Sequence, residues 1–189
     1  MPNWCQNAVS IRHEDPTKIQ ALAAAMREAQ FLGTVIPVPQ DLLETIAGHY
    51  NDEQTQKDLE IAQAYNIKTY GFANWYDFCV SRWGTKWEVD CHSVEVSEDG
   101  CEINAVFDSA WSPPVGVYQA LLDQNFAVVG RYYEPGMAFA GEWNNGFDNS
   151  YDLSDLKSHE VREMIGEDLD DALAISESMA MWEEDCEDD

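Results

Sequence analysis

Basic residues are scarce in this sequence of 189 residues. It has 10 lysines and arginines against 36 aspartates and glutamates, which gives a formal net charge of -26 at pH 7. Proteins that bind the phosphates of DNA, RNA or anionic lipids need lysine and arginine to displace counterions. We therefore expect no direct binding to nucleic acid and no binding to a membrane.

Long apolar runs are absent as well. The sequence has no run of about 18 or more apolar residues, the length that a helix needs to span a bilayer. The N-terminal stretch MPNWCQN has neither the basic nor the apolar region of an export signal. We therefore expect a protein of the host cell cytoplasm. The five cysteines are odd in number and widely spaced, which favours free thiols in a reducing compartment over disulfides.

The spacings that hold metals or mark common catalytic centres are also missing. The sequence contains no CxxC or HxxxH pair, and none of the motifs GxxxxGK[ST], GxSxG and HExxH. We therefore predict no metal, no cofactor and no catalytic residue, and a protein that is not an enzyme.

Hydrophobic residues are plentiful, at 45% of the chain, so a core can form. The alternation in CQNAVSIRH predicts a strand. Asp15 followed by Pro16 predicts the start of a helix, with apolar residues at helical spacing behind them. A second helix is expected over about residues 52–65. A third begins near Asn74 and breaks at Gly84.

After Gly84 the apolar period falls from about 3.6 to 2, which indicates strands. The stretch KWEVDC predicts a strand with Trp87, Val89 and Cys91 on one face. The change of parity after His92 suggests a β-bulge. The turn EDG then predicts a hairpin with CEINAVFDSAW as its second strand.

The segment SPPVGVYQALLDQN predicts a helix capped by Ser112, with Pro113 at its first position. The strands FAVVGRYYEPG and MAFAGEW and the turn NNG follow. Without an insertion at about residues 34–82, the order of elements is β-α-β-β-α-β. We therefore predict an α+β fold: a ferredoxin-like split βαβ antiparallel sheet with an inserted helical segment and an extra edge strand.

The last part of the chain has a different character. We predict an α+β domain over residues 1–150 and an acidic amphipathic helix and tail over residues 151–189. The apolar positions of this helix are Val161, Ile165, Leu169, Ala172, Leu173 and Ala180.

Four blocks, MPNWCQN, WGTKWE, AWSPP and YYEPGMAFAGEW, occur in this order. Together they resemble the YubB-type ferredoxin-like domain, a family found on bacterial plasmids and phages. The resemblance covers roughly residues 1–143. It implies the same fold and a genomic setting on mobile elements, but no defined biochemical activity.

Aromatic rings and one lysine suggest a groove that would hold a ligand by stacking. The candidate groove residues are Trp83, Lys86, Trp111, Tyr133 and Glu134. The competing interpretation places most of these rings, and Trp87, in the core. It also pairs Lys86 with Glu134 or with another of the many carboxylates. We favour this second interpretation.

Carboxylates dominate residues 132–189, which hold 18 acidic and 2 basic residues. A surface studded with carboxylates can imitate the field of duplex DNA, and the net charge exceeds the magnitude of about 2–8 that keeps a small domain in solution. The predicted contact residues are Asp148, Asp152, Asp155, Glu163, Glu167, Asp168, Asp170, Asp171, Glu183, Glu184 and Asp185.

We therefore predict a non-enzymatic nucleic-acid mimic from a mobile element. It would bind and inhibit or modulate a basic nucleic-acid-binding host protein of a restriction, CRISPR or repair system, as anti-defence and anti-CRISPR proteins do. One alternative is a small-ligand-binding or enzymatic domain that uses the aromatic groove with Lys86 and Glu134. Another is a scaffold whose tail docks on a single partner.

Overall fold

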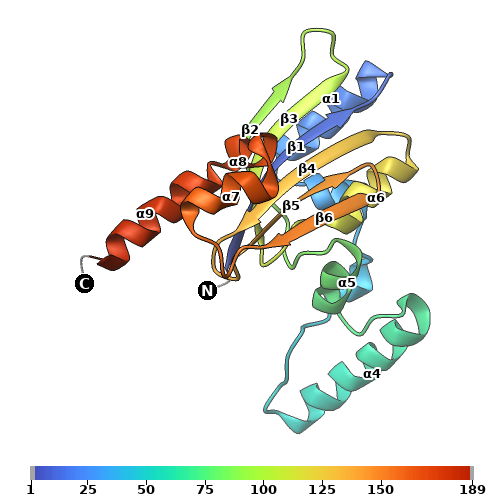
Figure 1. The fold of residues 1–189 in the computed structure, drawn as a ribbon. Coiled ribbons are helices and arrows are strands. Elements are labelled where there is room, and N and C mark those ends of the chain that lie inside the picture. The colour runs from blue at the N-terminus through green and yellow to red at the C-terminus, as the bar shows by residue number, and fades with distance from the viewer. Residues whose placement is uncertain (1–2, 188–189) are drawn as a thin grey trace.

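Six strands form one antiparallel sheet in the computed structural model, which describes residues 3–187 and the side chains of residues 3–184. Their order across the sheet is β2-β3-β1-β4-β5-β6 (Figure 1). The strands are β1 (Trp4–Arg12), β2 (Cys91–Val96), β3 (Glu102–Ala110), β4 (Ala127–Glu134), β5 (Phe139–Asn144) and β6 (Phe147–Asp152). The helices are α1 (Pro16–Arg27), α2 (Phe31–Val35), α3 (Gln40–Leu43), α4 (Glu53–Tyr70), α5 (Trp75–Arg82), α6 (Val115–Asp123), α7 (Ser158–Ile165), α8 (Glu167–Leu173) and α9 (Ile175–Glu187).

The first four strands with α1 and α6 follow the β-α-β-β-α-β order, and β1 lies between β3 and β4, antiparallel to both. The predicted α+β fold with this ferredoxin-like strand order is therefore confirmed. The extra strand β5 is also present, but it is not the edge of the sheet. It pairs with β6, a strand that the sequence analysis missed. The sequence of β6, FDNSYD, is mostly exposed and shows no apolar alternation.

The main core lies under the face of the sheet that α1 and α6 cover. On β1, Val9 and Ile11 point to this face, opposite Ala105 and Ile103 of β3. The predicted Asp15 cap is present and accepts a hydrogen bond from Thr17 N. Each large aliphatic side chain buried here contributes about 1.5–3 kcal/mol, so this layer supplies most of the stability.

The helices α7 and α8 cover part of the other face of the sheet, and α9 extends away from it (Figure 1). The second core cluster joins side chains of the sheet to side chains of α7, α8 and α9. Its buried members are Tyr133, Ala140, Leu153, Val161, Ile165, Leu169 and Ile175. The predicted domain boundary at residue 150 falls inside β6, and the segment beyond it packs on the sheet.

The prediction of a single C-terminal helix is wrong, because the segment forms three helices. The chain turns at Gly166, with φ at 86°, and at Ala174, with φ at 49°. Glycine tolerates this left-handed region and commonly ends helices. The two breaks divide the apolar positions that suggested one helix, so that Val161 and Ile165 lie on α7 and Leu169 lies on α8.

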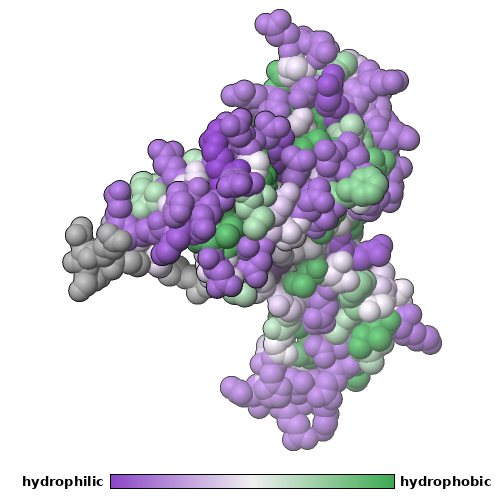
Figure 2. Space-filling view, viewed as in Figure 1, coloured by the Kyte–Doolittle hydropathy of each residue, from purple (hydrophilic) through white to green (hydrophobic). Residues whose placement is uncertain are grey.

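The inserted segment between α1 and β2 is helical, as predicted. Helix α4 begins after its cap Asp52 and runs to Tyr70, five residues beyond the predicted end. It projects away from the sheet (Figure 1). Its expected apolar positions Ile61 and Tyr65 are exposed, and hydrophobic side chains show on the surface of this part of the molecule in Figure 2.

Two local predictions around β2 and α6 are wrong. The stretch KWEVDC becomes a strand only at Cys91, because the Glu88 carboxylate accepts hydrogen bonds from Leu32 N and Gly33 N and draws the preceding chain toward α2. Ser112 does not cap α6, since its hydroxyl donates to Gly84 O and the cap is Pro114. The bulge is confirmed, because the β2–β3 register shifts between Cys91 and Ser93.

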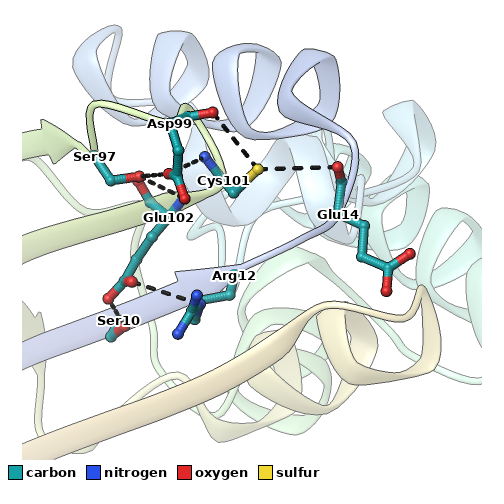
Figure 3. Close-up of polar contacts among 7 residues, drawn as sticks. All are labelled: Ser10, Arg12, Glu14, Ser97, Asp99, Cys101 and Glu102. Carbon is teal, nitrogen blue, oxygen red and sulfur yellow. Dashed lines mark hydrogen bonds and ion pairs between the residues drawn. The ribbon is translucent and has the colours of Figure 1, made fainter.

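The predicted hairpin between β2 and β3 is also confirmed (Figure 3). Asp99 Oδ1 accepts hydrogen bonds from Ser97 Oγ at 2.6 Å and from Cys101 N at 3.0 Å. Glu102 accepts a hydrogen bond from Ser10 Oγ at 2.9 Å. These contacts fix the turn and tie β3 to β1, so they have a structural role.

The contact between α9 and α7 depends on a carboxylate. Glu183 accepts hydrogen bonds from Ser158 Oγ at 2.8 Å and from Ser158 N at 3.0 Å, and these bonds lower the pKa of Glu183. A lowered folded-state pKa stabilises the fold above the unfolded value of about 4.5, and the contribution is lost as the pH falls through the folded value.

We expect Glu183→Gln to lower the melting temperature at pH 7 and to have a smaller effect at about pH 3, because the contribution of this carboxylate declines as the pH falls below 4.5. Thermal unfolding followed by circular dichroism at both pH values measures this difference. Glu184→Gln is the matched control, because it removes the same charge from an exposed neighbour. Equal effects of both variants at pH 7 would contradict the assigned role of Glu183.

Candidate functional site

A groove lies between the second face of the sheet and the helices α7 and α9. Its volume is about 1150 Å³. Trp4 and Gln6 of β1 and Asp108 of β3 line one side, and Met179 and Trp182 of α9 line another. The groove is open to solvent and has both apolar walls and polar groups, as binding sites commonly do.

Three exposed tryptophans extend this groove along the surface. Trp4, Trp87 and Trp111 keep 49%, 38% and 40% of their area accessible. The ring centroids of Trp4 and Trp87 are 6.3 Å apart, and those of Trp87 and Trp111 are 6.5 Å apart. Because Trp4 also lines the groove, the two features are continuous. We call Trp4, Trp87, Trp111 and Lys86 the aromatic surface.

Lys86 contacts rings rather than a carboxylate. Its Nζ lies 4.2 Å from the ring centroid of Trp87, 5.2 Å from that of Trp111 and 5.5 Å from that of Tyr76. Within residues 3–184 it forms no ion pair, so the predicted pair with Glu134 or another carboxylate is wrong. The ring quadrupoles attract the ammonium group in place of a negative charge.

The expected burial of Trp87 is also wrong. It lies in the irregular stretch before β2, where strand alternation does not apply. Trp111 has φ at 68°, a left-handed conformation that is rare for a bulky residue. The backbone N–H of Trp111 donates a hydrogen bond to Asn3 O at 2.9 Å, which ties Trp111 to the start of β1. Strain of this kind often occurs at functional sites.

The structure divides the five predicted groove residues among three places. Tyr133 and Glu134 line the groove, whereas Lys86 and Trp111 belong to the aromatic surface. Trp83 is buried in the main core, where its Nε1 donates to Ile36 O, so it is not available to a ligand.

The two groove residues from β4 are both buried. The Glu134 carboxylate accepts hydrogen bonds from Gly136 N at 2.9 Å and from Met137 N at 2.6 Å, which closes the turn after β4. Burial raises the pKa of the Tyr133 hydroxyl, so this group stays neutral. The two side chains do not form an acid–base pair. Both form part of the wall of the groove.

Sequence reasoning missed the two exposed tryptophans that border the groove, Trp4 and Trp182. Trp4 stands directly before an alternating strand, so it could have been placed at the end of a sheet. Trp182 keeps 71% of its area exposed on a helix that is otherwise acidic. An isolated tryptophan among carboxylates was the available signal.

The described cysteines are free thiols, as the sequence analysis favoured. Cys5, Cys79, Cys91 and Cys101 are free thiols, and Cys186 has no described side chain. Burial raises the pKa of Cys79 and that of Cys91 to about 12. Thiols with such values are poor nucleophiles and poor metal ligands near neutral pH.

Most of the predicted acidic contact residues are exposed. These are Asp148, Asp152, Asp155, Glu163, Glu167, Asp168, Asp171 and Glu184. Among them, Asp148 Oδ1 accepts a hydrogen bond from the Tyr132 hydroxyl at 2.6 Å, and Asp171 pairs with Arg162 at 2.7 Å. Glu183 is half-buried in its contact with Ser158, and the side chain of Asp185 lies outside the described residues.

Asp170 is an exception, because it is only 2% exposed. Its carboxylate accepts hydrogen bonds from Ser176 N and Ser176 Oγ, both at 2.7 Å, and lies 3.3 Å from Arg162 Nη1. The prediction that Asp170 contacts a partner is therefore wrong. It joins the ends of α7, α8 and α9 instead, and helical periodicity did not reveal this because the helix breaks were not foreseen.

The exposed acids of α8 border a small hollow of about 420 Å³. Glu167 and Asp168 line it together with Glu142 of β5 and Asn149 of β6. Glu142 is paired with Arg131 at 2.9 Å. Within the part of the chain that the structure describes, no group of histidine, cysteine and acidic residues is arranged to hold a metal ion. The exposed acids of β6, of the loop after it, and of α7 and α8 are here called the acidic face. They are Asp148, Asp152, Asp155, Glu160, Glu163, Glu167, Asp168 and Asp171.

No protein-family model and no characterised protein matches the chain. The chain is similar in structure to protein api92 from Yersinia pseudotuberculosis, of the family DUF1281, with 12% identity, a TM-score of 0.43, and coverage of 80% of this chain and 98% of that one. The YubB-type resemblance stays a prediction. Among the described residues, no helix has the length and apolar character that crossing a membrane requires.

Asp170 and Asp171, which are neighbours on α8, test whether the buried carboxylate is structural and the exposed one is not. We expect Asp170→Ala to lower the free energy of unfolding by about 2 kcal/mol, because it leaves buried donors without an acceptor. Asp171→Ala, the matched control, should change it by about 0.5 kcal/mol or less. Urea denaturation measures both values. A similar small effect for the two variants would show that Asp170 is not structural.

Proposed function

We propose that this protein binds a basic, nucleic-acid-binding partner through its acidic face and acts as a non-enzymatic mimic of nucleic acid. The observation that supports the proposal best is the excess of carboxylates that lack a basic neighbour. Residues 132–189 contain only two basic residues, Lys157 and Arg162. Arg162 is already shared by Glu167, Asp170 and Asp171.

The rest of the acidic face carries uncompensated charge. Asp152, Asp155, Glu163 and Asp168 are exposed and form no ion pair among the residues whose side chains are described. Figure 2 shows a mainly hydrophilic surface over α7 and α8. Such a surface attracts cationic proteins over a distance of about one Debye length and speeds their association.

The proposal extends to the biological setting. The YubB-type resemblance of the sequence implies a mobile element, and the partner would then be a host protein of a restriction, CRISPR or repair system. In this role the protein would act in the cytoplasm of the host and would inhibit or modulate the partner by occupying its nucleic-acid-binding surface. It would need no metal, cofactor or catalytic residue.

Affinity capture tests the proposal. The tagged protein is incubated with a bacterial lysate at low salt, and bound proteins are eluted with rising salt and identified. We expect a basic nucleic-acid-binding protein that elutes as salt rises, because screening weakens the attraction. Capture of no such partner, or of one that salt does not release, would count against the proposal.

A charge-neutralising variant tests the position of the contact. We expect Glu163→Gln/Glu167→Gln/Asp168→Asn to weaken the captured partner's binding by about tenfold at low salt, and less at high salt. Biolayer interferometry at several ionic strengths measures both effects.

The matched control neutralises three exposed carboxylates on α4, in Glu53→Gln/Asp58→Asn/Glu60→Gln. It changes the net charge by the same amount but leaves the acidic face intact. If both triple variants weaken binding equally, the net charge matters and the acidic face does not.

A further inference from the structure

The groove and the aromatic surface are formed by other side chains than those of the acidic face, and both expose apolar area to water. Trp4 and Trp182 border the groove and are 49% and 71% exposed. Exposed apolar area that is clustered marks interaction sites, and tryptophan is enriched among the residues that contribute most to binding. The volume of about 1150 Å³ exceeds the range of about 300–1000 Å³ typical of small-molecule sites. A peptide segment fits this size better than a small ligand does.

The aromatic surface has an affinity for cations that the structure displays directly. Lys86 Nζ lies 4.2 Å from the Trp87 ring centroid and 5.2 Å from that of Trp111. In a chain with 36 acidic residues, this ammonium group nevertheless contacts rings. Lys86 uses part of the ring area, and the exposed fractions of Trp4, Trp87 and Trp111 leave further ring area accessible.

The charges along the groove favour a basic occupant. Asp108, Glu183 and the buried Glu134 line it, against Lys157 and His159. Asp108 is half-buried and lies 3.2 Å from His92 Nε2. The net charge of -26 adds a negative field over the whole molecule. An acidic or neutral segment would gain nothing from this field, whereas a basic segment would be complementary to it.

Building on the proposed function, we propose that the groove and the aromatic surface bind an extended, arginine-containing segment of the basic partner. Guanidinium groups stack on the accessible faces of Trp4 and Trp87, and the apolar side chains of the segment contact Leu156 and Met179 in the groove. Arginine is favoured over lysine because its planar, weakly hydrated group stacks on aromatic rings. The acidic face attracts the partner, and the groove selects the segment that it holds.

Two labelled peptides test the proposal by fluorescence anisotropy. One alternates arginine with leucine, and the other has lysine in place of each arginine. We expect the arginine peptide to bind about tenfold more tightly to the native protein. Trp4→Ala should weaken the arginine peptide by about tenfold and abolish the preference. Trp182 borders the groove from α9, away from β1, so Trp182→Ala should also weaken binding of the arginine peptide without disturbing the fold around β1.

Two further variants serve as controls. Phe147→Ala removes an equally exposed ring of β6 that does not line the groove, and it should leave both affinities unchanged. Glu163→Gln/Glu167→Gln/Asp168→Asn should weaken both peptides by the same factor and keep the preference for arginine. Circular dichroism confirms that each variant is folded.

The outcomes separate the groove from the acidic face. Equal binding of the two peptides to the native protein, or an unchanged preference in both Trp4→Ala and Trp182→Ala, overturns the groove proposal. Salt-dependent capture of a basic partner would still stand in that case. Failure of both peptides to bind at low salt also overturns it. If light scattering shows that Trp4→Ala converts a dimer to a monomer, the occupant is a second copy of the chain, and the proposal is wrong.

Discussion

The apolar contact between the second face of the sheet and the three C-terminal helices determines where the acidic face and one wall of the groove lie. Tyr133 and Ala140 of the sheet meet Val161, Ile165 and Leu169 of the helices in one buried cluster. At about 1.5–3 kcal/mol for each large buried side chain, this contact can hold an acidic segment against its own repulsion. Without it, the acidic face would have no fixed shape and the groove would lose one wall.

Carboxylates have two separate roles in this arrangement. Asp170 and Glu183 accept hydrogen bonds from backbone and hydroxyl groups and hold the helices together. Asp155, Glu163 and Asp168 are exposed, and among the residues whose side chains are described they accept no such hydrogen bond. The first group stabilises the fold, whereas the second adds repulsion that the fold must withstand. A cationic partner would neutralise these carboxylates, and the loss of their repulsion would favour binding.

The aromatic residues show a similar division. Trp83 and Trp143 are buried, and the Trp83 ring N–H donates to Ile36 O. Trp87 and Trp111 are accessible and share Lys86. The left-handed backbone at Trp111 carries a cost in conformational energy, which the tie to Asn3 helps to offset. The structure therefore holds these rings at the surface.

The strand order was predictable because β1 and β3 alternate, β4 is rich in valine and tyrosine, and the caps and turns of α1 and β2–β3 have typical residues. The site was less predictable for physical reasons. Glu88 accepts hydrogen bonds from backbone N–H groups of α2, 55 and 56 residues earlier in the chain, and no local sequence pattern indicates this contact. The burial of Asp170 depends on helix breaks at Gly166 and Ala174, of which only the glycine is a usual signal.

Displacement by DNA tests the central claim most directly. The complex with the captured partner is titrated with duplex DNA at low salt, and the fraction of protein released is measured. If the protein occupies the nucleic-acid-binding surface of its partner, DNA releases it completely, and raising the protein concentration restores the complex. If DNA and the protein bind the partner together without competition, the protein is not a mimic of nucleic acid.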